Sequence, residues 1–286
     1  MILIVDSGST KSDWLAVDNN GKKLMDKIRT KGLNPAILSE KKLFKIINKS
    51  SELKDNKEKV THVFFYGAGC GTENAKELLK GVLSSIFVTA HIEVNEDTLA
   101  AVYATISHPK EAAVVCILGT GSNCSYYDGE VLHQRVLSLG YTLMDDASGN
   151  YYGKQLIRDY YFNNMPENVR IAFGAKYNME ADYIKYNLYK QPSPNAYLAN
   201  FAEFMFLHKD SEYTINLIKD GIRLFAKNMI FQYQEELKTA PVHFAGSIAY
   251  FSQDEIKAVA QEMGFKVGNF QRRPIDGLVG FHTKNL

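Results

Sequence analysis

Short apolar runs alternate with polar turns and with amphipathic stretches along most of the chain. Apolar runs bounded by small or polar residues predict buried strands, whereas apolar residues spaced three or four positions apart predict helices. We predict strands at residues 2–5, 12–17, 23–28, 60–66, 86–94, 112–118, 123–127 and 242–245, and helices at residues 39–53, 74–83, 97–105, 253–263 and 274–281. Tight turns join the first three strands, which should therefore form an antiparallel meander.

The order of strand, small-residue loop, strand and polar turn occurs twice. It opens the chain and begins again at residue 112, after a polar break at residues 108–111. The two copies do not align as sequences, so the repeat is one of architecture. We therefore predict an α/β protein with two tandem domains, residues 1–108 and 109–286, the second carrying a helical insertion at about residues 151–238.

Composition and charge narrow the range of partners. Of the 286 residues, 33 are lysine or arginine and 32 are aspartate or glutamate, so the net charge of +1 gives no reason to expect nucleic acid or an anionic membrane. The apolar start reaches Asp6 without a basic leader, and no apolar run approaches 18 residues. Cys70, Cys116 and Cys124 are too scattered for a disulfide framework and should be buried free thiols. We expect a soluble, cytoplasmic protein that binds a small molecule.

The first turn brings together a carboxylate and several hydroxyl groups. Its sequence is Asp6-Ser7-Gly8-Ser9-Thr10-Lys11. Such a turn can direct N–H and hydroxyl groups at an anion, Thr10 or Lys11 would touch a phosphate, and Asp6 would hold Mg²⁺ through water. An ordinary hairpin turn with Asp6 as a turn former explains the same residues. Because a strand follows and not a helix, the turn is neither a Walker P-loop nor a dinucleotide fingerprint.

A second turn of this kind lies between the strands predicted at residues 112–118 and 123–127. Its sequence is Gly119-Thr120-Gly121-Ser122-Asn123. Two glycines and two hydroxyls suit a phosphate or a sugar hydroxyl, although a tight hairpin alone would also use them. Two such loops, one opening each half of the chain, indicate phosphate binding more strongly than either loop does alone.

These turns resemble the first and second phosphate motifs of the hexokinase, Hsp70 and actin superfamily, and Ala245-Gly246-Ser247 resembles its glycine turn that contacts adenosine. Residues 119–124 are similar to those of N-acetylglucosamine kinases of the BadF/BadG/BcrA/BcrD ATPase family. The resemblance implies two ribonuclease H-like (actin-like ATPase) domains with a nucleotide cleft between them, ATP and Mg²⁺ as cofactors, and a homodimer. The phosphate- and nucleotide-binding residues that it implies are Ser7, Gly8, Ser9, Thr10, Lys11, Gly119, Thr120, Gly121, Gly246 and Ser247.

Asp97 is the candidate catalytic base. It lies where a predicted strand ends and an alanine-rich helix begins, and a helix start favours an ionised carboxylate. Sugar kinases of the family place there an aspartate that accepts the proton of the attacking hydroxyl. Asp97 or Asn95 would otherwise simply cap the helix.

Residues 139–148 resemble the family pattern G-W-G-x-x-x-G-D-E-G-S, which holds sugar hydroxyls. The chain departs from the pattern at Tyr141, Met144 and Ala147, and residues 67–71 lack a serine that the family carries, so the sugar is left open. A helix start capped by Asp145, Asp146 and Ser148, and a plain turn at Asn34, are the alternatives. The sugar-binding residues that the resemblance implies are Asn34, Asp97, Thr120, Asn123, Tyr141, Asp145 and Asp146.

The resemblance thus implies ATP-dependent phosphorylation of an amino sugar, N-acetylglucosamine or a related hexosamine, at the 6-hydroxyl. Positioning, charge neutralisation and one base are enough for such a transfer. One alternative is an ATPase that activates a partner enzyme, which requires cysteines that ligate an iron–sulfur cluster. Another is a non-catalytic sugar sensor. A sensor of that kind would carry a DNA-binding domain ahead of the position of Asp6 and a zinc-binding cysteine cluster.

Overall fold

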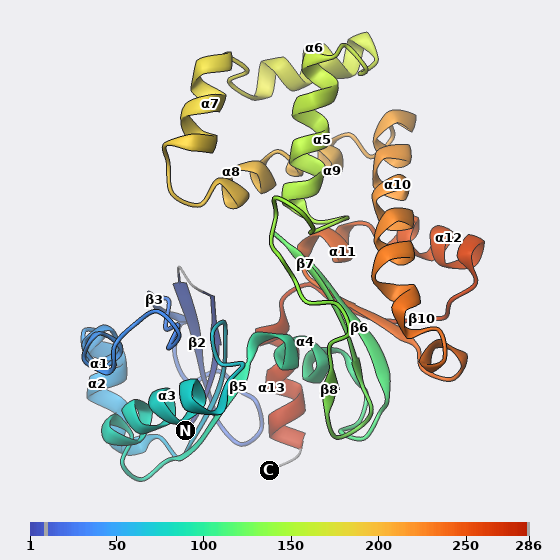
Figure 1. The fold of residues 1–286 in the computed structure, drawn as a ribbon. Helices are drawn as coiled ribbons and strands as arrows, with labels where there is room; N and C mark the ends of the chain where they lie inside the picture. Colours follow the sequence, from blue (N-terminus) through green and yellow to red (C-terminus); the bar gives the residue numbers. More distant parts are fainter. Residues whose placement is uncertain (9–10, 285–286) are drawn as a thin grey trace. The chain divides into compact units, whose positions relative to one another are not determined.

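Two five-stranded mixed sheets form the framework of the chain (Figure 1). The computed structural model describes residues 1–8 and 11–284. The chain divides into unit 1, Met1–Pro109 with Arg273–Leu286, and unit 2, Lys110–Arg272. The predicted α/β class with two domains of similar design is confirmed. Residues 273–286, which the sequence analysis assigned to the second domain, belong to unit 1.

The sheet of unit 1 has the strand order β3-β2-β1-β4-β5. The first three strands form the predicted antiparallel meander, and β4 and β5 run parallel to β1. The carboxyl ends of β1, β4 and β5 therefore lie along one edge. The elements are β1 (Ile2–Ser7), β2 (Lys11–Val17), β3 (Ile28–Lys31), α1 (Glu40–Asn48), α2 (Ser51–Asn56), η1 (Lys57–Lys59), β4 (His62–Gly67), α3 (Glu73–Ile86), β5 (His91–Glu96), α4 (Asp97–Thr105) and α13 (Pro274–Lys284).

Helices cover both faces of this sheet. On one face Val5 and Trp14 pack with Leu43 of α1 and Leu79 of α3. On the other face lie α4 and α13, and Leu278 of α13 joins a second apolar cluster. Figure 1 shows α13, the red helix near the end of the chain, beside α4. This contact with α4 and β1 is why the last helix belongs to unit 1.

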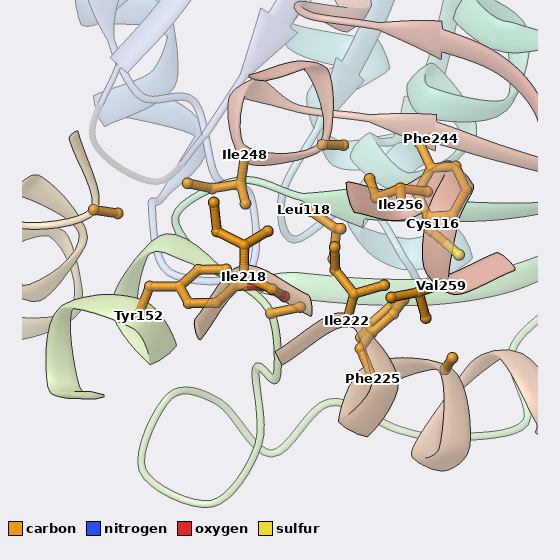
Figure 2. Packing of buried hydrophobic residues seen from close by; sticks show 14 of the residues in the cluster. Cys116, Leu118, Tyr152, Ile218, Ile222, Phe225, Phe244, Ile248, Ile256 and Val259 are labelled. Carbon is orange, nitrogen blue, oxygen red and sulfur yellow. The ribbon is translucent and has the colours of Figure 1, made fainter. Parts of the chain in front are cut away.

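The sheet of unit 2 has the strand order β10-β9-β6-β7-β8, with β6 to β8 antiparallel and β9 and β10 parallel to β6. Its helices pack around a core that includes Tyr152, Ile218 and Phe225 (Figure 2). The elements are β6 (Ala113–Leu118), β7 (Ser122–Tyr127), β8 (Leu132–His133), α5 (Gly149–Tyr161), α6 (Glu167–Lys176), α7 (Ala181–Tyr189), α8 (Pro194–Asn200), α9 (Glu203–Leu207), α10 (Glu212–Asn228), η2 (Ile230–Tyr233), η3 (Glu236–Lys238), β9 (Val242–Ala245), α11 (Ser247–Phe251), α12 (Gln253–Met263) and β10 (Val267–Gln271).

Three predicted elements of unit 1 need correction. The strand expected at residues 23–28 is instead β3, because the Asp18 carboxylate accepts two backbone N–H groups and lengthens the turn that follows β2. The helix expected at residues 39–53 is two helices, since Ser50 caps the start of α2. The strand expected at residues 86–94 is β5, because α3 continues to Ile86.

The three cysteines are free and buried, as predicted. Cys116 and Cys124 face each other across β6 and β7, with their sulfur atoms 3.6 Å apart. No helix in the described residues has the length and apolar character needed to cross a membrane.

Candidate active-site residues

Two predicted residues of unit 1, Asp6 and Asp97, lie near each other at the carboxyl edge of its sheet. Asp6 is close to the end of β1, and Asp97 begins α4 directly after β5. Burial, then the charges of Asp97 and Asp13, raise the pKa of Asp6 to about 6. Burial also raises the pKa of Asp97, although solvent reaches this residue. The edge therefore carries two carboxylates, each harder to ionise than usual.

Carboxylate oxygens are the ligands that a divalent cation prefers, although no group of three or more acidic, histidine or cysteine side chains in the described residues is placed to hold one. The nearby ion pairs go to Asp13, which binds Lys27 at 3.1 Å and Arg29 at 2.8 Å. No lysine or arginine of the described residues forms an ion pair with Asp6 or Asp97. Hard cations such as Mg²⁺ prefer carboxylate oxygens, and a cation near Asp6 would offset the repulsion that raises its pKa.

The first loop follows β1, and its described residues are partly engaged within unit 1. The Gly8 N–H donates to the Lys11 carbonyl at 3.0 Å. The Ser7 hydroxyl is buried, lies 2.7 Å from the Ser12 hydroxyl and accepts the Leu33 N–H at 3.0 Å. The structure thus gives the Ser7 side chain a structural role, whereas Lys11 is exposed and its charge lowers the pKa of Asp6. Ser9 and Thr10 lie outside the described residues.

Asn34 and the glycine loop after β4 lie together. Asn34 is buried, and its Oδ1 accepts the Ala36 N–H at 2.9 Å, as in the turn that the alternative interpretation predicted. Gly69 has φ of +82°, and a Cβ at this position would lie 1.9 Å from Asn34 Oδ1. Only glycine fits there, so the loop backbone packs directly on the Asn34 side chain.

In unit 2 the second loop connects β6 to β7. The Gly119 N–H donates to the Gly121 carbonyl at 3.0 Å, and the carbonyls of Gly119 and Thr120 accept the N–H groups of Gly149 and Asn150 at 2.8 and 3.0 Å. The N–H groups of Thr120 and Gly121 donate to no backbone group in the part of the chain that the structure describes. Backbone N–H groups without an acceptor in the protein are available to an anion.

Asp145 lies beneath this loop. Its carboxylate accepts the Ser122 N–H at 3.3 Å and the Asn150 Nδ2 at 2.9 Å, and a Cβ at Gly121 would lie 2.9 Å from Asp145 Oδ2. Asp145 belongs to residues 139–148, which resemble the family's sugar-binding pattern, and the structure places it against the second loop. Ala147, at a position where the family has glycine, has φ of +56°, so the backbone is left-handed despite the substitution.

The other polar residues of this segment lie in different surroundings. Ser148 caps α5 by accepting the Tyr151 N–H, as the alternative interpretation predicted. Asp146 accepts Asn228 Nδ2 at 2.9 Å, and the Tyr141 carbonyl accepts Lys154 Nζ at 2.6 Å. A cavity of about 320 Å³ is lined by Ser122, Val136, Ser138, Leu143, Met144, Asp145, Asp146, Asn228, Met229 and Gln232.

Some of the predicted sugar-binding residues do not line that cavity. The largest of the cavities named here is also not the one that contains predicted site residues. Asn123 Oδ1 accepts the amide of Gln134 at 3.2 Å and so helps to hold the β7 hairpin. A larger cavity of about 680 Å³ beside β3 in unit 1 contains none of the predicted site residues.

The glycine turn after β9 contacts the second loop. Gly246 has φ of +109°, and a Cβ there would lie 2.3 Å from the Leu118 carbonyl oxygen and 3.1 Å from Gly119 N. Its N–H donates to the Gln271 carbonyl at 2.9 Å, and Ser247 begins α11. The turn that resembles the adenosine motif thus lies directly against the start of the second loop.

Comparison with solved structures identifies the family. A putative N-acetylglucosamine kinase from Porphyromonas gingivalis is 32% identical, with 100% of this chain and 99% of that chain covered and a TM-score of 0.89. The chain belongs to the same family as this putative N-acetylglucosamine kinase. No protein-family model and no curated protein matches the chain.

More distant structures share the fold alone. A putative N-acetylglucosamine kinase from Chromobacterium violaceum is 14% identical over 98% of both chains, with a TM-score of 0.65. A ROK family glucokinase from Streptomyces griseus, solved with glucose and AMPPNP, is 14% identical over 98% of this chain and 97% of its own, with a TM-score of 0.58. The fold is therefore the two-lobed fold of actin-like sugar kinases.

Sequence reasoning missed Asn150, which is hydrogen-bonded to the second loop. Its backbone and side chain both bond to Thr120, and its side chain also bonds to Asp145. The only signal in the sequence is an asparagine shortly after the Ser148 cap, where helices commonly begin, so nothing marks it as a partner of the loop.

Proposed function

We propose that this chain is an ATP-dependent sugar kinase that phosphorylates an amino sugar, N-acetylglucosamine or a related hexosamine, at the 6-hydroxyl. The observation that carries the proposal is the pair of carboxylates Asp6 and Asp97, which bind no cation of the described protein. A kinase needs one carboxylate for its metal and one for its base, whereas a sensor needs neither. The 32% identity to the Porphyromonas gingivalis protein supports the same activity.

Unit 1 supplies the base and the metal ligand. The Asp97 carboxylate accepts the proton of the sugar hydroxyl while the hydroxyl oxygen bonds to the γ-phosphorus of ATP, the bond to the β-phosphate oxygen breaks, and ADP leaves. Asp6 holds Mg²⁺ through water, and when bound this ion neutralises charge on the phosphates. Gly8, Lys11 and the backbone of the first loop contact the phosphates.

Unit 2 supplies phosphate donors and sugar contacts. The free N–H groups of Thr120 and Gly121 bind a phosphate, which is supported by the pairing of the neighbouring carbonyls. Gly246 and Ser247 contact the adenosine. The sugar-binding residues in this proposal are Asn34, Asp97, Thr120, Asn123, Tyr141, Asp145 and Asp146. Membership of the BadF/BadG/BcrA/BcrD family, a cytoplasmic location and a homodimer belong to the same proposal.

The test measures ADP release from MgATP with hexoses, amino sugars and N-acetylated amino sugars. We expect one sugar to raise turnover well above the rate without sugar. Asp97→Asn should lower the sugar-dependent kcat by roughly 10²- to 10⁴-fold, because it removes the base and keeps the side-chain size. The control is Glu93→Gln, an exposed residue of β5 that has no proposed role, which should leave kcat unchanged.

A single rate of ADP formation whatever the sugar would contradict the kinase proposal. That result would favour an ATPase that activates a partner enzyme. The cysteines argue against that alternative, because an iron–sulfur cluster shared between subunits needs exposed thiolates, and Cys70, Cys116 and Cys124 are all buried.

A further inference from the structure

Asn150 lies in the first turn of α5 and is fully buried. Its backbone N–H donates to the Thr120 carbonyl at 3.0 Å. Its side-chain Nδ2 donates to the same carbonyl at 2.7 Å and to Asp145 Oδ2 at 2.9 Å. We propose that Asn150 is a positioning residue that orients the Gly121 N–H of the second loop toward a phosphate of ATP. The inference rests on the proposed function.

The geometry of the peptide unit links these hydrogen bonds to phosphate binding. In a trans peptide the C=O and the following N–H point in opposite directions. The Thr120 carbonyl and the Gly121 N–H belong to one peptide unit, so bonds that hold the carbonyl against α5 direct the N–H away from it. The same holds one residue earlier, where the Gly119 carbonyl accepts the Gly149 N–H at 2.8 Å and the Thr120 N–H is left free. The first turn of α5 therefore orients both free donors.

A short, uncharged amide side chain suits the place of Asn150. Both of its partners, a carbonyl and a carboxylate, are acceptors, so the side chain must offer two donors from one atom. An aspartate would repel both partners, and an apolar residue would leave Asp145 with one donor fewer. The Asn150 Oδ1 is buried and accepts no hydrogen bond from the described residues. A buried acceptor without a hydrogen bond lowers the stability of the folded chain. Asn150 is therefore better explained by its two donor bonds, which hold the loop and Asp145, than by a contribution to stability.

The test compares two ligands, the non-hydrolysable analogue MgAMPPNP and adenosine, on the full chain without sugar. Asn150→Ala should raise the Kd of MgAMPPNP about 10-fold or more, in line with the loss of a charge-assisted and a neutral hydrogen bond. The Kd of adenosine, which has no phosphate, should change less than about twofold. Asn150→Ser keeps one shorter donor and should lie between Asn150→Ala and the unchanged protein; it also replaces Asn150→Ala if that variant does not fold.

The matched control is Tyr152→Phe in the same helix, which removes a buried hydrogen bond to the Ile218 carbonyl without touching the loop. It should lower the Tm without changing either Kd. Unchanged MgAMPPNP binding in the Asn150 variants, or an equal loss for both ligands, would overturn the positioning role while leaving the kinase proposal intact. If the unchanged protein bound neither ligand, the proposed function itself would fail, and this inference with it.

Discussion

At Gly246, both the backbone conformation and the close approach of a neighbouring carbonyl require the absence of a side chain. Its φ is +109°, and a Cβ would lie 2.3 Å from the Leu118 carbonyl oxygen, which is backbone and cannot turn aside. Gly246→Ala should therefore lower the free energy of unfolding of unit 2 by about 3 kcal/mol and also weaken nucleotide binding, because Leu118 leads into the second loop. Urea unfolding followed by far-UV circular dichroism measures the first effect.

Gly264→Ala is the control, because Gly264 also has positive φ, +82°, but no atom lies within 4 Å of an added Cβ. This variant should lower the stability by about 1 kcal/mol through backbone strain alone. Equal losses in the two variants would show that the contact with Leu118 does not contribute.

The candidate residues that the sequence indicates are those whose neighbours in the sequence carry the signal. Asp97 begins a helix directly after a strand, and Gly246 directly follows β9, so a short motif marks each of them. Asn150 bonds to Thr120, 30 positions away, and the Ser7 hydroxyl bonds to Leu33, 26 positions away. Such pairs form only when the chain folds, and for this reason the contact of Asn150 with the second loop was missed and the Ser7 hydroxyl was expected to face a phosphate.

Helix α13 joins unit 1 through a buried histidine. His282 stacks on Phe64, with ring centroids 3.6 Å apart, and its Nε2 lies 2.8 Å from the Tyr66 hydroxyl. Burial lowers the pKa of His282 to about 4. Between pH 6.5 and 4 the unfolded chain therefore binds a proton at His282 that the folded chain does not, so the contribution of His282 to the stability of unit 1 should fall by about 2–3 kcal/mol as the pH falls through this range. Asp6, whose pKa is raised to about 6, acts in the opposite direction over the same range, so the His282 contribution is the difference between the unchanged protein and a variant without this histidine.

Trp14 is the only tryptophan and is buried in unit 1, so its fluorescence during urea unfolding measures this effect. His282→Phe keeps the stacking and removes the proton site, so between pH 6.5 and 4 its stability should rise relative to that of the unchanged protein by about 2–3 kcal/mol. The same pH dependence in the variant and in the unchanged protein would show that His282 does not contribute.

Elements with clear ends and a regular pattern were predicted with the bounds observed, namely α4, α12 and β9. The strands β8 and β10 were not predicted. Both lie at the edges of their sheet, and β8 has two residues, so neither presents a long apolar run. The place of α13 was also missed, because its partners β1 and α4 come from the start of the chain and the sequence carries no sign of that pairing.

Each unit has an apolar core of its own, which sets an expectation for how the molecule unfolds. Phe225 is fully buried in the core of unit 2 and Leu79 in that of unit 1. Phe225→Ala should lower the stability of unit 2 by about 3–5 kcal/mol and Leu79→Ala that of unit 1 by about 2–5 kcal/mol. Trp14 fluorescence reports unit 1, whereas far-UV circular dichroism reports unit 2 more strongly, because most of the helices lie there.

If the units unfold independently, Phe225→Ala should move the circular dichroism midpoint to lower urea and leave the Trp14 midpoint in place, and Leu79→Ala should do the opposite. Independent units are expected because domains that bury separate cores generally unfold as separate cooperative units. A shift of both midpoints by the same amount in either variant would mean that the two cores unfold in one cooperative step. In that case stability losses measured by circular dichroism, including that of Gly246→Ala, would belong to the whole chain and not to unit 2 alone.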